Sequence, residues 1–127
     1  MKTGCFFTYD GPGRISIARF APRDIPEGYC VFKQLAPRRW FNSASKDEFE
    51  EQFNHHLRSL DPLKIWIRLH ELAGTATLDQ PAIGGISHPE PVLLCWERYP
   101  FDHSNWCHRS LVARWFHDTL GKDVSEL

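Results

Sequence analysis

The sequence lacks the features that mark several large classes of protein. No apolar run is long enough to cross a bilayer, and the first ten residues lack the apolar stretch of a signal peptide. The formal net charge is only −1, whereas proteins that coat nucleic acids carry a broad basic excess. We therefore expect a cytoplasmic protein with no membrane partner. The charge balance still leaves room for a local pocket lined by arginine.

Two common catalytic motifs are also missing. Gly11 and Gly13 flank a proline, but neither the lysine nor the helix of a glycine-rich phosphate loop follows them. A phosphatase-type cradle needs a loop of several residues between its cysteine and its arginine. Cys107 and Arg109 are separated by one residue, and no arginine stands at the corresponding distance from Cys95. The sequence therefore argues against both kinds of phosphate site.

The remaining composition is that of an ordinary folded protein. Hydrophobic residues make up 42% of the chain and charged residues 24%, and a length of 127 residues predicts one domain spanning 1–127. The chain has four cysteines and no Cys-x-x-Cys pair. In a reducing compartment we expect these cysteines to be thiols rather than disulfides. They stand at positions 5, 30, 95 and 107.

Several short segments have the composition of strands. Residues 5–9 are aromatic and β-favouring, and residues 14–19 alternate polar with apolar side chains, as in a half-exposed strand or a sheet edge. Residues 29–32 form a further candidate. The apolar run at 92–94 is typical of a buried strand, and the last four residues, 124–127, suggest an edge strand.

Three segments have helical periodicity. The first starts at a capping box opened by Ser45 and carries one apolar face, which should lie on a sheet. The second is capped by Asp61, ends at Gly74 and is apolar on most sides, so we expect it to be the most buried helix. The third runs from Cys107 to Gly121. This order predicts a layered α/β fold with a partly parallel sheet flanked by helices.

The stretch between the last predicted strand and the last helix is the candidate site. A buried strand stops at Cys95, a polar loop containing Pro100 follows, and a helix begins at Cys107. In open α/β sheets, ligands bind where a strand ends and the next helix begins, because free backbone N–H groups and the helix dipole point there. The two triplets 95–97 and 107–109 should therefore converge on one cavity.

These motifs resemble domain-of-unknown-function family 488. The similar segments are residues 93–97 (Leu-Leu-Cys-Trp-Glu), 107–109 (Cys-His-Arg), 113–115 (Ala-Arg-Trp), Gly121 and a closing Val-x-Glu, with 11–19 and 35–37 in the amino half. The resemblance implies a small Rossmann-like α/β domain with a pocket at Cys95, Glu97, Cys107, His108 and Arg109. It supplies no reaction. This sequence departs from the family pattern in a long insert between the motifs and in the tryptophans Trp96 and Trp106.

The residues of the second triplet each have a functional and a structural interpretation. Cys107 at a helix start, beside His108, would have a lowered thiol pKa and act as a nucleophile, or it would be a small buried cysteine. Arg109 would bind a phosphate or carboxylate, or it would pair with Glu97 and hold the loop. In the catalytic interpretation Glu97 and His108 transfer protons.

The loop between the motifs contributes candidate ligand contacts. The rings of Trp96 and Trp106 could stack on a base or sugar, or simply pack the loop down. Asp102 and His103 could form an acid/base pair, and Cys95 would line the pocket beside them. The predicted ligand-binding residues are thus Arg109, Cys95, Trp96, Trp106 and His103.

A metal site is a third interpretation of the same residues. Cys95, His103 and Cys107, with Glu97 or His108 in reserve, are donors that zinc accepts. Against this, Cys107 and His108 as helix neighbours would diverge by about 100°. The sequence therefore assigns no metal ligand and identifies no cofactor.

Two functional classes follow. In the first, the domain binds and processes a phosphate-bearing ligand, such as a nucleotide or nucleic-acid fragment, with Cys107, His108 and Glu97 as catalytic residues. In the second, the same motifs form a structural clasp, with or without zinc, in a non-catalytic module whose ligand is a partner protein. The sequence does not decide whether the protein is an enzyme.

Overall fold

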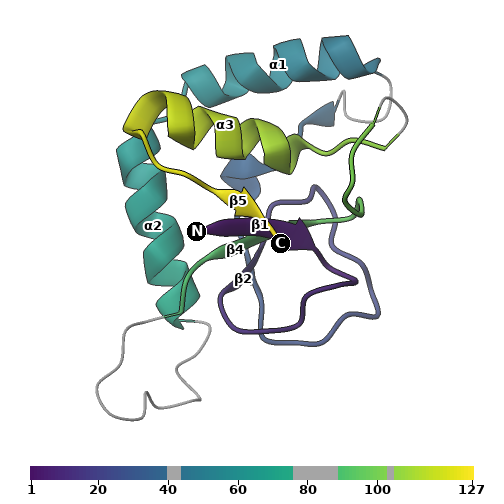
Figure 1. Ribbon diagram of the computed structural model, residues 1–127, viewed down its shortest axis with the longest axis vertical. Coiled ribbons are helices and arrows are strands. Elements are labelled where there is room, and N and C mark those ends of the chain that lie inside the picture. Colours follow the sequence, from purple (N-terminus) through teal and green to yellow (C-terminus); the bar gives the residue numbers. More distant parts are fainter. Residues whose placement is uncertain (40–43, 76–88, 103–104) are drawn as a thin grey trace.

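The computed structural model describes residues 1–39, 44–75, 89–102 and 105–127 and has an α/β fold (Figure 1). A five-stranded sheet has the order β3-β2-β4-β1-β5, and each neighbouring pair is parallel. The sheet is therefore more completely parallel than the sequence predicts, and the arrangement is that of a small Rossmann-like domain. The strands are β1 (Lys2–Cys5), β2 (Arg14–Ser16), β3 (Cys30–Val31), β4 (Val92–Cys95) and β5 (Ser125–Glu126).

The first strand lies earlier in the chain than its composition suggests. The aromatic segment 5–9 is not a strand, because β1 ends at Cys5 and the chain turns there, with the Thr8 backbone N–H donating to the Cys5 carbonyl at 3.2 Å. The end of β1 at Cys5 is set by its pairing with β4. Cys5 is opposite Cys95 in the parallel ladder, so both strands end at the same edge of the sheet.

The second strand is an inner strand, not the half-exposed or edge strand predicted for 14–19. β2 lies between β3 and β4, and all three of its residues are buried. The polar side chain of Arg14 is accommodated inside because its guanidinium donates to the carbonyls of Gly11 (3.0 Å) and Pro26 (2.8 Å). The edges are β3 and β5, as expected for the segment 124–127.

The three predicted helices are present as α1 (Lys46–Arg58), α2 (Pro62–Thr75) and α3 (His108–Leu120), and a short 3₁₀ helix covers Lys33–Leu35. Their caps match the sequence signals. Ser45 Oγ accepts the Glu48 backbone N–H at 3.2 Å, and Asp61 Oδ1 accepts that of Leu63 at 3.1 Å. Gly121 ends α3 with a left-handed φ of 65°. Among the described residues, no helix is long and apolar enough to traverse a lipid bilayer.

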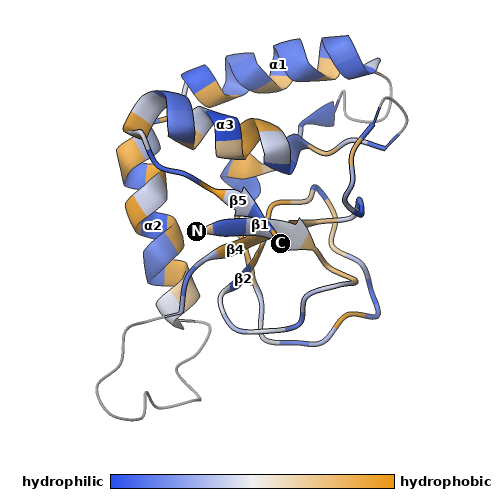
Figure 2. Cartoon of the chain, in the orientation of Figure 1, coloured by the Kyte–Doolittle hydropathy of each residue, from blue (hydrophilic) through white to orange (hydrophobic). Residues whose placement is uncertain are grey.

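The helices cover one face of the sheet and loops cover the other (Figure 1). Leu93 of β4 belongs to the large core formed with the helices, while its neighbours Val92 and Leu94 pack with Phe6 and Ile25 from the loops. α3 lies between the sheet and α1. Hence α1 packs mainly against α3 rather than on the sheet, and its outer surface is largely hydrophilic (Figure 2).

α3, and not α2, is the most buried helix. α2 leaves Leu63 and Ile67 about half exposed, at 55% and 50%. α3 contacts the sheet and both other helices, and it buries five residues, including Trp115 and Phe116. The many apolar residues of α2 predicted that the helix would be buried on most sides. In the structure only the side that carries Ile65 packs against the core.

Gly13 permits the close approach of β2 and β4. Its φ is +80°, and a Cβ atom there would lie 2.1 Å from the carbonyl oxygen of Glu90. The Gly13 carbonyl in turn accepts the Val92 backbone N–H at 2.8 Å. A side chain at this position would push apart the two strands whose far ends form the candidate site.

Truncation of the core of α1 tests this layer arrangement. Phe53 is a fully buried residue of α1. Phe53→Ala should therefore lower the free energy of unfolding by about 3–5 kcal/mol. Phe20, which is 63% exposed, is the matched control, and Phe20→Ala should cost less than about 1 kcal/mol. Urea unfolding measures both values, and similar losses for the two variants would contradict the packing.

Candidate functional site

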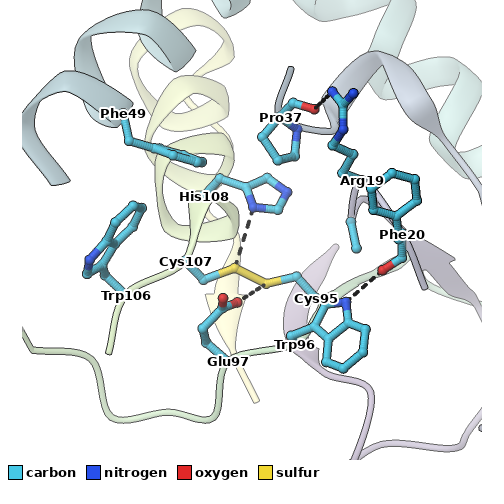
Figure 3. Close-up of a pocket in the computed structure, with 11 residues that line it drawn as sticks. Arg19, Phe20, Pro37, Phe49, Cys95, Trp96, Glu97, Trp106, Cys107 and His108 are labelled. Carbon is cyan, nitrogen blue, oxygen red and sulfur yellow. Dashed lines mark hydrogen bonds between the residues drawn. A yellow bond between two sulfur atoms is a disulfide. The ribbon is translucent and has the colours of Figure 1, made fainter. Parts of the chain in front are cut away.

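A cavity of about 540 Å³ opens at the carboxyl ends of β2 and β4, beside the first turn of α3 (Figure 3). The predicted convergence of the two motifs is therefore present, with one exception, Arg109. The lining residues are Ala18, Arg19, Phe20, Pro37, Phe49, Cys95, Trp96, Glu97, Trp106, Cys107 and His108. This position is the one that ligands occupy in open parallel sheets.

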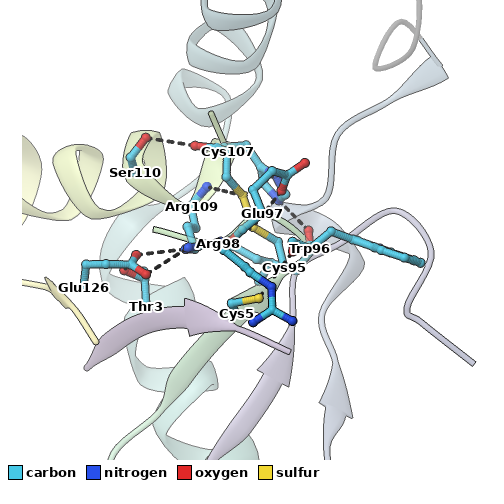
Figure 4. Close-up of a disulfide and its surroundings, with 12 residues drawn as sticks. Thr3, Cys5, Cys95, Trp96, Glu97, Arg98, Cys107, Arg109, Ser110 and Glu126 are labelled. Carbon is cyan, nitrogen blue, oxygen red and sulfur yellow. Dashed lines mark hydrogen bonds and ion pairs between the residues drawn. A yellow bond between two sulfur atoms is a disulfide. The ribbon is translucent and has the colours of Figure 1, made fainter. Parts of the chain in front are cut away.

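The floor of the cavity contains a disulfide between Cys95 and Cys107 (Figure 4). The expectation that all four cysteines are thiols is wrong for this pair and holds for Cys5 and Cys30. The parallel sheet brings the end of β4 close to the start of α3. The expectation of thiols was based on the redox compartment and did not take this proximity into account. In the disulfide state Cys107 has no thiolate, so its predicted role as nucleophile requires prior reduction.

His108 lies beside the disulfide with its ring orientation fixed. Nε2 is 2.6 Å from the Ile17 carbonyl oxygen, which can only accept, so Nε2 carries the proton. Nδ1 is 3.6 Å from Cys107 Sγ and presents its lone pair toward the sulfur. Burial, and to a smaller extent the nearby charge of Arg109, lower the pKa of His108 to about 4 against the opposing effect of the bond to Ile17. The imidazole is therefore neutral near pH 7.

Glu97 lies on the other side of the disulfide. Its Oε2 atom is 3.5 Å from Cys95 Sγ, and the carboxyl group faces the cavity (Figure 3). Burial raises the pKa of Glu97 above its ordinary value, while a backbone hydrogen bond and the charge of Arg109 act in the opposite direction. A carboxyl group shifted in this way is better matched to proton transfer near neutral pH than an exposed one.

Arg109 lies behind the cavity and does not line it. Its side chain is fully buried, and Nε and Nη2 donate to the two carboxylate oxygens of Glu126 at 2.8 and 2.9 Å (Figure 4). Nη1 donates to the Glu97 carbonyl at 2.6 Å and to Cys95 Sγ at 3.0 Å. The geometry thus favours the loop-holding role for Arg109, with the carboxylate of Glu126 as its partner in place of that of Glu97.

The aromatic residues of the motifs form two walls. Trp96 is 46% exposed, and its Nε1 donates to the Phe20 carbonyl at 2.6 Å. On the opposite side, Trp106 meets Phe49 edge to face at 4.7 Å (Figure 3). Both tryptophans therefore line the cavity, as predicted. His103 lies outside the described residues, so its suggested pairing with Asp102 is not addressed.

Sequence reasoning missed the wall contributed by Arg19, Phe20 and Phe49. The first two follow β2. Arg19 belonged to the segment 14–19, predicted as a half-exposed strand or a sheet edge, and no position was predicted for Phe20. If residues 14–16 are recognised as an inner parallel strand, their carboxyl end must reach the same edge as Cys95, and Arg19 becomes a candidate. Phe49 comes from α1, and nothing in the local sequence indicates that α1 reaches the cavity.

The floor also contains a cluster of possible metal donors. Among the described residues, one donor atom each from Cys95, Cys107 and His108 lies within 4.8 Å of the other two. The argument that Cys107 and His108 diverge on a helix does not apply. Cys107 is the N-cap of α3, with extended φ and ψ of −144° and 145°, so the helical rotation per residue begins only after it.

Comparison with protein-family models, curated proteins and solved structures finds no match for this chain. The resemblance to domain-of-unknown-function family 488 therefore stays a prediction.

The buried ion pair predicts a large structural effect of Arg109. Arg109→Ala leaves the Glu126 carboxylate without its positive partner and the Glu97 carbonyl without the Arg109 donor, so the free energy of unfolding should fall by about 3–5 kcal/mol. Arg114, 81% exposed and 3.9 Å from Asp118 on the same helix, is the matched control. Its alanine variant should lose less than about 0.5 kcal/mol. Near-native stability of Arg109→Ala in urea unfolding would return Arg109 to a ligand-binding role.

The buried His108 predicts a pH dependence of stability. Between pH 6.5 and 4 the unfolded chain binds a proton at this residue that the folded chain does not, so the free energy of unfolding falls as the pH falls. The total effect is about 3 kcal/mol. His108→Gln keeps an N–H donor for the Ile17 carbonyl and should flatten the slope in this window.

Urea unfolding at several pH values measures this slope. The control is His55→Gln, the same substitution at an exposed position. If His108→Gln and the unmodified protein show the same pH dependence, the ring is not buried in its neutral form.

Proposed function

We propose that the protein binds a phosphate-bearing small molecule with a flat ring, such as a nucleotide or a nucleic-acid fragment, in the cavity beside Glu97 and His108. The observation that carries the proposal is the combination of aromatic walls with one arginine at the carboxyl edge of a parallel sheet. Cavities of roughly 300–1,000 Å³ hold ligands of this size, and this one measures about 540 Å³.

The aromatic walls suit a planar group. Trp96 and Phe20 lie on one side of the cavity and Trp106 and Phe49 on the other (Figure 3). Flat rings accept the face of any nucleobase without reading its edge, and each stacking contact contributes about 1–3 kcal/mol. This supports binding of a base or a similar ring, with little discrimination between bases.

Arg19 takes the anion-binding role that the sequence gave to Arg109. Its guanidinium lies 5.6 Å from the centre of the Phe20 ring, and Nη1 donates to the Pro37 carbonyl at 3.4 Å. It is half-buried at the cavity wall. A guanidinium can bind a phosphate through two parallel N–H donors, which a lysine ammonium cannot do.

The floor supplies groups for proton transfer. Glu97 faces the cavity with a raised pKa, which suits a general acid or base acting on the bound ligand. His108 is neutral and held by the Ile17 carbonyl. A cytoplasmic location, as the sequence predicts, would place such a site among abundant nucleotides.

Calorimetric titration with adenosine monophosphate, adenosine and inorganic phosphate tests the proposal. The monophosphate should bind more tightly than either fragment. Trp96→Ala should weaken its binding about fivefold or more, since stacking is worth at least about 1 kcal/mol, and Arg19→Gln should lower the affinity to that of adenosine. Leu63→Ala and Arg23→Gln, both at exposed positions outside the cavity, are the matched controls.

Two results would contradict the proposal. The first is that none of the three ligands binds to the unmodified protein. The second is that the monophosphate binds equally well to the Arg19 and Trp96 variants and to the controls.

A further inference from the structure

We propose that, when the Cys95–Cys107 disulfide is reduced, the cavity floor binds one Zn²⁺ ion through Cys95 Sγ, Cys107 Sγ, His108 Nδ1 and the Glu97 carboxylate. This metal site does not depend on the phosphate-bearing ligand proposed above. It rests on three donor atoms, from Cys95, Cys107 and His108, that all lie within 4.8 Å of one another. Glu97 Oε2 lies 3.5 Å from Cys95 Sγ, and its side chain would turn toward the ion to complete the set (Figure 3).

Two of the distances between donors match those of a tetrahedral zinc site. With zinc bonds of about 2.3 Å to sulfur and about 2.0–2.2 Å to nitrogen or oxygen, neighbouring donors in a tetrahedron are roughly 3.5 Å apart. Cys107 Sγ lies 3.6 Å from His108 Nδ1, and Cys95 Sγ lies 3.5 Å from Glu97 Oε2. Two edges of the tetrahedron are therefore already present, and they share no atom.

The third requirement is separation of the two sulfur atoms. Around a zinc ion they must stand about 3.8 Å apart, which follows from the zinc–sulfur bond length. The Cα atoms of Cys95 and Cys107 are 7.3 Å apart, whereas disulfides usually join Cα atoms separated by about 4.4–6.8 Å. The backbone therefore leaves room for an ion once the sulfur–sulfur bond is broken.

His108 has the outer-shell contact typical of a metal-bound histidine. Such a ring usually donates its second N–H to a carboxylate or a backbone carbonyl, which fixes the tautomer and orients the lone pair. Here Nε2 donates to the Ile17 carbonyl at 2.6 Å, and Nδ1 faces the sulfur atoms. The ring packs edge to face on Phe53 at 5.2 Å, so its orientation is held before any ion arrives.

The charge balance of the floor also suits the ion. Two thiolates and one carboxylate contribute three negative charges, and Zn²⁺ leaves one of them uncompensated. Arg109 lies beside this group, with Nη1 3.0 Å from Cys95 Sγ, and its positive charge is shared between this group and the Glu126 carboxylate. N–H donors to metal-bound sulfur stabilise the thiolate form that zinc requires.

The change of state is a two-electron reduction followed by metal binding. A small dithiol transfers two electrons and two protons to the Cys95–Cys107 bond and is itself oxidised to a disulfide. Zinc then replaces the two thiol protons, which leave to solvent as the zinc–sulfur bonds form. The oxidised floor lacks both thiolates and should not hold the ion.

Titration of the reduced protein with Co²⁺, a coloured substitute for zinc, tests the site. We expect one ion per chain, visible bands of a tetrahedral complex, and an ultraviolet charge-transfer band with the intensity of two thiolates, all abolished by added Zn²⁺. The untreated disulfide form should give none of these bands. Cys107→Ser and His108→Gln should each lower the affinity at least about 100-fold, whereas the matched control Cys30→Ser should keep it.

A second measurement uses the unmodified protein and does not depend on the folding of variants. Zn²⁺ should protect Cys95 and Cys107 of the reduced chain from alkylation and leave the labelling of Cys30 unchanged, as read from peptide masses. Equal labelling of Cys95 and Cys107 with and without Zn²⁺, or a cobalt spectrum without thiolate bands, would overturn the metal site. Neither result bears on nucleotide binding, because that titration is performed on the disulfide form.

Discussion

The ion pair between Arg109 and Glu126 is the interaction on which the site depends. It joins the first turn of α3 to the edge strand β5, and the same guanidinium also donates to Cys95 and to the backbone of Glu97. One fully buried cation thus fixes four parts of the chain: helix start, strand end, loop and carboxyl-terminal strand. An isolated charge in this position would be strongly unfavourable, so the carboxylate and the neighbouring acceptors are a condition of the fold and cannot be varied independently.

The location of the cavity follows from the parallel sheet. The carboxyl ends of neighbouring parallel strands lie at the same edge of the sheet. Here β2 and β4 end side by side, and the chain continues from β2 to Arg19 and from β4 to Glu97. The walls can therefore come from segments far apart in the sequence without long connections. α3 returns directly over this edge, which places His108 and Cys107 above the end of β4. Because helices occupy only one face of the sheet, the cavity remains open between the helix layer and the loops.

The sequence predicted the helices and the meeting of the two motifs well, because these depend on local signals. Caps at Ser45, Asp61 and Gly121 and the apolar run before Cys95 are short-range features that tertiary structure did not override. The inner position of β2 was not predicted. β2 alternates like an edge strand only because Arg14 finds backbone acceptors inside the fold. The disulfide was missed because a reducing compartment was expected, although the two motifs were predicted to meet. The partner of Arg109 was missed because Glu126 is positioned by the pairing of β5 with β1, which composition does not encode.

The chemical state of the sulfur atoms decides which groups of the floor face a ligand. As a disulfide, Cys95 and Cys107 are uncharged and poor donors, and Glu97 is then the acidic group at the cavity that can exchange protons with a bound molecule. As thiolates, the same two atoms add negative charge close to Glu97, which disfavours a second anion unless a cation intervenes. An anionic ligand held by Arg19 and an uncompensated pair of thiolates therefore oppose one another across the cavity. The disulfide and the cation are alternative ways to neutralise the floor, and either one leaves the aromatic walls and Arg19 in place.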